Sequence, residues 1–429
     1  MIKRIPLLAL VLLAFLGLLL PSAAVAGGGA PNPGDTAWML TATALVLLMT
    51  PGLSFFYGGM VTRKNVLSTM LQSFVAMGVV SLLWVVVGFS LCFGESLGGV
   101  IGNPFTFFML RGVGGQTHPD LSPTIPLVLF ALFQLKFAII TPALITGSFA
   151  ERVRFSSYIL FMLLFSLLIY PPLAHATWHP EGWLRKMHVL DFAGGTVVHM
   201  SAGFAALAGA LYLGRRRQPS HQPANIPFVL LGTGMLWFGW FGFNAGSALA
   251  ANDVASLAFL TTNTASAAAM LAWMFFDVAL GRKPTALGAC IGAVVGLVAI
   301  TPAAGFVTVG SSIFIGATAS ILSNLACSFK GKTGLDDTLD VFPCHGLGGI
   351  VGMILTGVCA QEVGLLAGQT QTFLAHLMAL VAVSLYTFGG SFALYWVTDR
   401  ILPLRVPASE ELLGLDLSQH GESLGEQAA

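Results

Sequence analysis

Charged residues are scarce in this chain: Lys, Arg, Asp and Glu together make up 9% of its residues, and the formal net charge is +1. This net charge gives no reason to expect nucleic acid as a partner. Cysteine is also rare, and the five cysteines lie in or beside apolar segments without ligand-like spacing, so we expect no disulfide framework, zinc site or other cofactor. Hydrophobic residues make up 56% of the chain, which predicts a polytopic membrane protein.

The N-terminus has the pattern of a targeting segment. Lys3 and Arg4 precede an apolar run that ends in small residues, Ala24-Val25-Ala26. This order is typical of a secretory signal peptide with an A-x-A cleavage site, and an uncleaved first membrane anchor is the alternative. We therefore expect residues 1–26 to be a signal peptide, whose cleavage would place the mature N-terminus outside the cytoplasm.

Eleven further apolar runs are long enough to cross a bilayer as helices. They lie near 37–60, 67–93, 124–149, 155–175, 193–213, 226–248, 254–280, 286–303, 309–329, 341–360 and 374–399. An odd number of spans puts the N-terminus outside and the C-terminus inside. The basic residues support this orientation, because the outside loops hold only Arg111, Arg185 and Lys186. The predicted fold is an all-α polytopic membrane protein with eleven transmembrane helices, a transmembrane domain over 27–400 and a cytoplasmic tail over 401–429.

Two motifs recur five spans apart. Residues 140–143 (ITPA) return as 300–303, and an Asp-led, Gly-rich helix with a buried histidine occurs at Asp191 and His199 and again at Asp340 and His345. An odd offset means that the two copies cross the membrane in opposite directions. The pattern indicates two inverted five-helix repeats plus a final helix, with a site near the midplane.

The segment 191–199 (DFAGGTVVH) places an acid and an imidazole inside an apolar helix, just over two turns apart and so near one face. Such groups usually face a bundle interior, a pore or each other. One interpretation is a helix N-cap followed by a hydrogen-bonded core histidine. Another is a polar step in which His199 and His345 meet at the pseudo-twofold axis and pass protons or accept a small donor. Haem ligation is a third use of paired membrane histidines.

Aromatic residues gather in the outer halves of several spans. The sixth span reads WFGWFGFNAGS over 237–247, including Phe243 and Ser247, while Phe133 and Phe137 lie in the third and Trp178 lies at the outer interface. Aromatic stripes in membrane proteins usually serve packing or interface belts. The alternative is a site for a small cation, which a desolvated ring face holds by ~2 kcal/mol or more.

A small cation held there would not easily cross while charged. An isolated ammonium group costs tens of kcal/mol in a low-dielectric interior, whereas deprotonating an amine of pKa ~10 at pH 7 costs about 4 kcal/mol. Deprotonation before crossing is therefore favoured, and the neutral amine needs only an apolar tunnel with acceptors along it.

Taken together, these segments resemble the ammonium transporter (Amt/Mep/Rh) family, and the Amt branch in particular. The matching pieces run through the whole mature chain, at residues 51–59 (PGLSFFYGG), 64–66, 133–137, 150–152 (AER), 191–199, 240–247, 287–289, 301–302, 336–352, 414–416 (GLD) and 420–422 (HGE). Each piece alone is a weak signal, while the set is specific.

The resemblance implies an ammonium or ammonia transporter in the bacterial inner membrane, assembled as a homotrimer with one pore per subunit. The residues to which it gives roles are Trp178, Phe137, Phe243 and Ser247 at an outer ammonium site, Asp191 as the carboxylate that supports this site, stacked Phe137 and Phe243 as the gate, and His199 and His345 as the paired pore histidines. The tail resembles the segment that couples subunits and, in bacterial members, helps to dock a PII signal protein.

Rival functions stay open within this fold. A sensor would report ammonium through the tail, although dedicated sensors commonly carry fused kinase or cyclase domains and we expect only a short tail here. A neutral gas channel of Rh type would not need the cation site of Trp178 and Ser247. An enzyme using Asp191 and His199 lacks an obvious nucleophile or metal cluster, so we expect none. Lys136 would repel ammonium if it lined the pore, and we expect it to have a structural or inter-subunit role.

Overall fold

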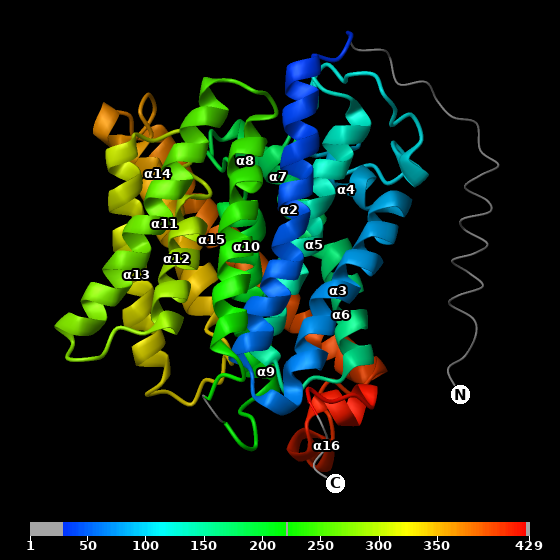
Figure 1. The fold of residues 1–429 in the computed structure, drawn as a ribbon. Coiled ribbons are helices and arrows are strands. Elements are labelled where there is room, and N and C mark those ends of the chain that lie inside the picture. Colours follow the sequence, from blue (N-terminus) through cyan, green and yellow to red (C-terminus); the bar gives the residue numbers. More distant parts are fainter. Residues whose placement is uncertain (1–28, 220–221, 426–429) are drawn as a thin grey trace.

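The computed structural model describes residues 29–219 and 222–425, and the predicted signal peptide at 1–26 lies outside the described residues. The described part is a bundle of long helices that run side by side (Figure 1). Ten of these helices are long and apolar enough to cross a membrane, and the chain is a multi-pass membrane protein.

The helices of the described part are connected mainly by short loops, and a single antiparallel pair of two-residue strands, β1 (Ser96–Leu97) and β2 (Ile101–Gly102), accompanies them. In chain order they are α2 (Pro33–Met60), η1 (Arg63–Asn65), α3 (Val66–Leu83), η2 (Trp84–Gly88), α4 (Phe89–Phe93), η3 (Phe108–Leu110), α5 (Leu127–Phe149), α6 (Phe155–Leu168), α7 (Tyr170–Trp178), α8 (Trp183–Lys186), η4 (Gly195–Met200), α9 (Ser201–Leu213), α10 (Ile226–Ala245), η5 (Gly246–Ala248), α11 (Asp253–Ala279), α12 (Ala286–Ile300), α13 (Val309–Lys330), η6 (Phe342–Gly346), α14 (Leu347–Cys359), η7 (Leu365–Ala367), α15 (Gln371–Ile401), α16 (Ala408–Leu413) and η8 (Asp416–His420).

Each of the ten candidate spans overlaps a predicted one, and the predicted span without a counterpart among them is 286–303. There the structure has α12, an apolar helix of 15 residues that is shorter than the other spans. The helix ends at Ile300 because Pro302, two residues further on, has no backbone N–H and its ring crowds the preceding turn. The count of eleven spans therefore stays a prediction.

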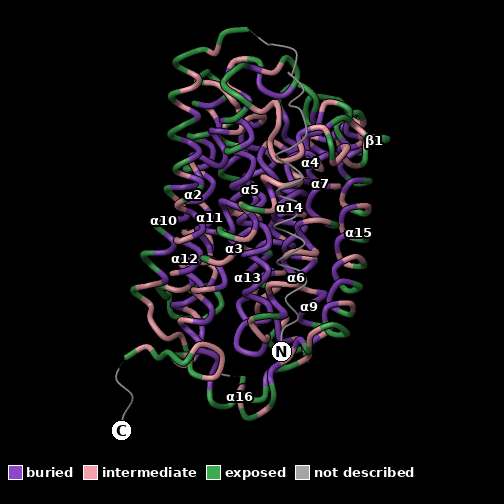
Figure 2. The backbone as a smooth tube through the Cα atoms, turned by 90° about the vertical axis from the view of Figure 1, so that its right-hand side faces the viewer, coloured by how far each residue is buried: buried purple, intermediate pink, exposed green. Residues whose placement is uncertain are grey.

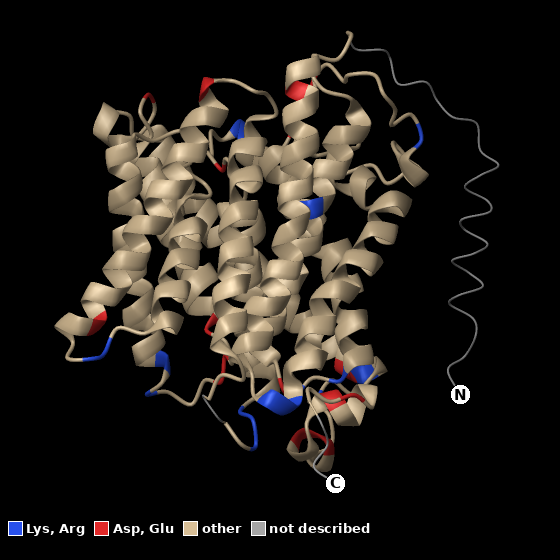
Figure 3. Cartoon of the chain, in the orientation of Figure 1, with Lys and Arg blue, Asp and Glu red and all other residues tan. Residues whose placement is uncertain are grey.

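Charged residues gather at the two ends of the bundle, as Figure 3 shows. We call the end that carries residues 402–425 the tail end and the opposite one the far end. The tail packs back onto the bundle, because the Asp416 carboxylate accepts hydrogen bonds from the N–H groups of Leu67 (3.0 Å) and Ser68 (2.7 Å) at the start of α3. Burial raises the pKa of the Asp416 carboxyl, although these two N–H groups favour its ionised form.

A buried ion cluster joins three loops at the tail end. Arg216 contacts Glu151 (2.7 Å) and Asp336 (2.9 Å), and each of the three side chains is less than a tenth exposed. Burial opposes ionisation of Asp336, but its hydrogen bonds with Arg216 outweigh this effect and lower the pKa of the Asp336 carboxyl. Arg152 donates to the Asp336 carbonyl (2.6 Å), and burial lowers the pKa of its guanidinium to about 10. The cluster thus links the three loops through buried ion pairs and hydrogen bonds.

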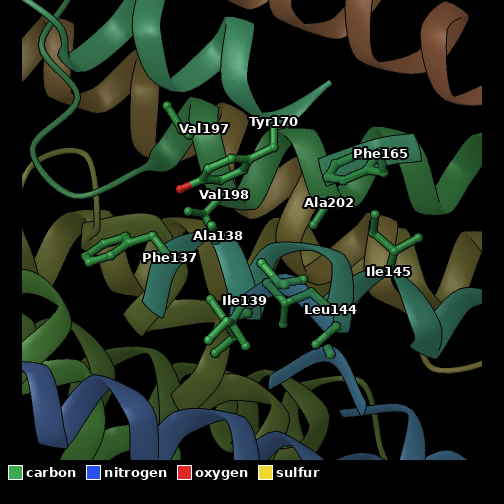
Figure 4. Packing of buried hydrophobic residues seen from close by; sticks show 14 of the residues in the cluster. Phe137, Ala138, Ile139, Leu144, Ile145, Phe165, Tyr170, Val197, Val198 and Ala202 are labelled. Carbon is green, nitrogen blue, oxygen red and sulfur yellow. The ribbon is translucent and has the colours of Figure 1, made fainter. Parts of the chain in front are cut away.

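The apolar core surrounds α5. In the membrane-spanning stretch of this helix, 89% of the residues are buried inside the bundle. Figure 2 shows the same pattern, with buried residues in the middle and exposed ones on the outer helices. Buried side chains of α5, among them Phe137, Ile139 and Leu144, belong to one packed cluster with Val197, Val198 and Ala202 from η4 and α9 (Figure 4). A helix buried on nearly all sides is apolar on nearly all sides, which explains why α5, apart from buried polar residues such as Gln134 and Lys136, shows no amphipathic pattern.

Two π-helical segments, η4 and η6, cross in the middle of the bundle and continue as α9 and α14. The closest approach is between α9 and η6, where a Cβ on Gly203 of α9 would lie 2.2 Å from the Gly346 nitrogen of η6. No larger residue fits at this crossing. The close approach brings His199 and His345, one on each π-helical segment, next to each other.

Two aspartates lie at the start of the second of these segments, and their carboxylates have different partners. Asp340 forms an ion pair with Lys330 (2.7 Å), whereas the Asp337 carboxylate accepts from the Phe342 N–H (2.8 Å). Asp337 precedes His345 by the same eight positions by which Asp191 precedes His199. Asp340 does lead this helix, because its carbonyl accepts the Cys344 N–H (3.0 Å), but the carboxylate that accepts from the helix start is that of Asp337. Burial raises the pKa of the Asp337 carboxyl to about 6, against the attraction of Lys330.

Candidate functional site

The Asp191 carboxylate organises the start of η4. It accepts from the N–H groups of Gly194 (2.8 Å), Gly195 (2.6 Å) and Thr196 (2.7 Å) and from the Thr196 hydroxyl (2.5 Å). Gly194 has φ 116°, a conformation that strongly favours glycine and turns the backbone around the carboxylate. Asp191 thus caps the helix of His199, as the N-cap interpretation predicted.

The Asp191 backbone has a second contact, with Trp178 at the end of α7. The indole Nε1–H of Trp178 donates to the Asp191 carbonyl at 3.1 Å, while the Trp178 carbonyl accepts from Arg185 at 2.8 Å. The ring of Trp178 stands edge-on to Phe137, with centroids 5.7 Å apart. These contacts fix the orientation of the indole beside the residues of α5.

A cavity of about 780 Å³ opens at the far end above these rings. Its lining includes Phe137, Trp178, Asp191 and Ser247, together with Thr177. The Ser247 hydroxyl donates to the Phe243 carbonyl at 2.8 Å, so its oxygen keeps free lone pairs that can accept a further donor. The cavity therefore offers a ring face, a hydroxyl acceptor and a nearby carboxylate.

Phe137 and Phe243 close the bottom of this cavity. Their rings stack with centroids 4.2 Å apart, and both side chains are buried. Phe137 lines the large cavity, while Phe243 lines a separate cavity of about 10 Å³ on the other side of the pair. A second cavity of about 10 Å³ lies further along, beside Tyr57 and His345. A space of this size holds about one water-sized molecule.

The imidazoles of His199 and His345 border the small cavities. Their Nδ1 atoms are 3.4 Å apart, and the side chains are 1% and 3% exposed. A haem does not fit between ring nitrogens that are in contact, so the haem interpretation is wrong for this pair. Two imidazoles packed this closely in an apolar interior favour the neutral form, since neither charge would be solvated.

Thr301, which the sequence analysis did not assign to the site, determines which nitrogens carry protons. Its hydroxyl donates to the Leu297 carbonyl (2.8 Å) and accepts from Trp240 Nε1 (2.9 Å). The remaining contact, with His199 Nε2 at 3.3 Å, therefore requires that nitrogen to be the donor. His199 Nδ1 is then bare and accepts from His345 Nδ1–H, which leaves His345 Nε2 as a free acceptor.

Lys136 lies one residue before Phe137 but lines neither the large cavity nor the two small ones. Its side chain is 8% exposed, and within the described residues it forms no hydrogen bond or ion pair. This placement agrees with the prediction that Lys136 does not line the pore.

Comparison with known proteins supports the family resemblance that the sequence motifs indicate. The Ammonium Transporter Family matches residues 37–424. An ammonium transporter of Aquifex aeolicus is 48% identical over 420 residues, covering 96% of this chain and 98% of the relative. Ammonium transporter Amt1 of Archaeoglobus fulgidus is 45% identical over 399 residues, covering 91% of this chain and 99% of the relative.

Solved structures share the fold. Mep2 of Saccharomyces cerevisiae has a TM-score of 0.83 at 34% identity and covers 89% of each chain. A structure described as a sensor Amt protein has a TM-score of 0.83 at 30% identity, covering 90% of this chain and 98% of the other.

Proposed function

The chain belongs to the ammonium transporter family, and we propose that it binds ammonium in the far-end cavity, deprotonates it above Phe137 and conducts neutral ammonia past His199 and His345. The observation that carries the proposal is the change in the cavities across the phenylalanine pair. Above Phe137 there is room for a hydrated cation and polar groups to receive it, and beyond Phe243 there is room for about one small molecule.

Ammonium is held above the ring pair by the Trp178 face and the Ser247 oxygen. Asp191 does not bond the ammonium directly, because both oxygens of its carboxylate are already occupied by hydrogen bonds. Its contribution is to attract the cation by charge and to hold Trp178 in place through its carbonyl. A desolvated cation–π contact contributes ~2 kcal/mol or more.

The energetics favour loss of the proton at this point, to the water that enters the open far-end cavity. Moving a bare ammonium ion into the apolar stretch beyond Phe243 would cost tens of kcal/mol, while deprotonation at pH 7 costs about 4 kcal/mol for an amine of pKa ~10. The neutral molecule then meets the free acceptor nitrogen of His345. His345 offers it a hydrogen bond through this nitrogen, and neither histidine offers the solvation that a cation needs.

The orientation and assembly that we propose follow from the sequence. The far end is outside and the tail end is cytoplasmic, with eleven spans arranged as two inverted five-helix repeats plus α15. Residues 1–26 are a signal peptide, 27–400 the transporter domain and 401–429 the tail. The subunit forms homotrimers in the bacterial inner membrane, and its tail takes part in docking a PII signal protein.

A sensor is the second candidate, and two observations favour it. The chain resembles a sensor Amt protein in fold, and its own tail is bonded to α3 through Asp416. A change at the pore that reached α3 would also reach the tail. Transport by the isolated protein in liposomes distinguishes the candidates, because a sensor needs no flux. A neutral gas channel differs from both by needing no cation site.

The experiment that tests the proposed function is an ammonium jump on proteoliposomes, with current and internal pH both recorded. Trp178→Leu and His199→Asp should each change the flux while leaving trimer assembly intact by size-exclusion chromatography. Trp396→Leu, a change at an exposed tryptophan of α15 (50% exposed), is the matched control and should behave like the wild type. Unaltered methylammonium uptake in both site variants would contradict the proposal.

A further inference from the structure

We propose that His376 of α15 is a positioning residue for the ammonium site at the far end, and this inference rests on the proposed function. His376 is fully buried and lines none of the three cavities described above. One ring nitrogen, Nδ1, lies 2.7 Å from the Met353 carbonyl of α14. The other, Nε2, accepts the Leu190 N–H at 2.9 Å. The imidazole therefore connects two helices to the residue directly before Asp191.

The connection continues into the site through the backbone of residues 190–192. Leu190 is held by His376, the Asp191 carbonyl holds the Trp178 indole, and the Phe192 N–H donates to the Pro302 carbonyl at 3.1 Å. The segment has no regular secondary structure, so these bonds rather than a helix ladder fix it. If the Leu190 bond is lost, the Asp191 carbonyl is free to shift and Trp178 loses its fixed partner.

The bonding pattern allows one state of the imidazole. A carbonyl can only accept, so Nδ1 carries the proton, and an amide N–H can only donate, so Nε2 is bare. A second proton on the ring would make Nε2 a donor, so that it would face the Leu190 N–H as donor to donor and the hydrogen bond would be lost. The charged group near the ring is Asp191, whose carboxylate is already engaged with η4. His376 thus links Met353 and Leu190 as a neutral imidazole, with Nδ1–H as its donor and Nε2 as its acceptor.

Two substitutions each keep one of the two hydrogen bonds of His376 and remove the other. The amide of glutamine reaches the position of Nε2, so His376→Gln keeps an acceptor for Leu190. The amide of asparagine lies at the position of Nδ1, so His376→Asn keeps the donor for Met353 and loses Leu190. Both variants remove the imidazole from the same buried place, so a merely structural role would affect them alike.

The experiment measures initial uptake rates in proteoliposomes across ammonium concentrations. We expect His376→Asn to raise KM about threefold to tenfold with Vmax within twofold, because one neutral hydrogen bond is lost at the site. His376→Gln should stay within about twofold of the wild-type KM, and His376→Ala, which lacks both bonds, should resemble the asparagine variant and serves if that variant does not assemble. Equal KM values in the asparagine, alanine and glutamine variants would overturn the proposal.

A double variant tests whether His376 acts through Trp178. In the Trp178→Leu background, His376→Asn should add little to KM, because the group that it positions is absent. Fully additive effects would overturn the proposal. If Trp178→Leu itself leaves KM and flux unchanged, the proposed function fails. If it raises KM while the His376 variants do not differ from one another, only the role of His376 fails.

Discussion

Replacing Asp191 by asparagine should weaken both the start of η4 and the ammonium site. In the native chain each carboxylate oxygen accepts two hydrogen bonds. Asparagine keeps one acceptor oxygen and puts an NH₂ donor where the other was. The Thr196 hydroxyl can rotate to accept from this NH₂. The backbone N–H of Thr196 can only donate, so it loses its acceptor. The loss is that of one to two hydrogen bonds to a charged acceptor, about 2–5 kcal/mol.

Thermal unfolding of the purified protein and the KM for ammonium are the two readouts. Asp120→Asn is the matched control, because Asp120 lines the same cavity and the substitution removes the same charge, while no helix start depends on its carboxylate. We expect Asp191→Asn to unfold at a clearly lower temperature than the wild type and Asp120→Asn to change stability by less than about 0.5 kcal/mol. Equal stability of the two variants, with unchanged KM, would refute the capping role.

The remaining predictions concern the pore and the tail end. Thr301→Val keeps the shape of the side chain but leaves the Trp240 N–H and the His199 Nε2 without an acceptor, so Vmax should fall with KM nearly unchanged, and equal kinetics would contradict the assigned histidine protons. Arg216→Met leaves two buried carboxylates unpaired and should destabilise the protein by about 3–5 kcal/mol in thermal unfolding, whereas Met at the exposed Arg217 should not. The folded protein binds a proton at Asp337 more tightly than the unfolded chain does, since its pKa is raised to about 6 from an ordinary 3.8, so stability should fall as pH rises from 4 to 7, by up to about 3 kcal/mol. Asp337→Asn should flatten this dependence, and a parallel pH profile would show that another group is responsible.

Much of the fold could be predicted because membrane spans are long apolar runs. Ten of the predicted spans overlap helices long enough to cross a membrane, and the span predicted at 286–303 is the shorter helix α12, which ends just before Pro302. The pairing of His199 with His345 followed from the repeated motif. The acid of the second motif could not be chosen from sequence alone, because 336–340 (DDTLD) offers three carboxylates. Only the packing of Lys330 against Asp340 and of Phe342 against Asp337 decides between them.

Thr301 and His376 show what sequence patterns do not reveal. A threonine hydroxyl in a helix ordinarily donates to a carbonyl of the preceding turn, as Thr301 does to Leu297. Nothing in the sequence indicates that two further donors, Trp240 Nε1 and His199 Nε2, contact the same oxygen. His376 lies almost 200 positions from Leu190 in the chain, so their bond depends entirely on how α15 packs. A sequence signal does exist for Asp337, which precedes its histidine by the same interval as Asp191.

The central claim is that the substrate is bound as the ammonium cation rather than as ammonia. The most direct measurement is the initial uptake rate in proteoliposomes at fixed total ammonium while the external pH is raised from 6 to 8. Each pH unit multiplies the ammonia concentration about tenfold, whereas the ammonium concentration hardly changes well below its pKa. We predict a rate that changes by less than about twofold over this range and that falls at every pH in Trp178→Leu. A rate that rises in proportion to ammonia, with no effect of Trp178→Leu, would contradict the account and identify a neutral gas channel.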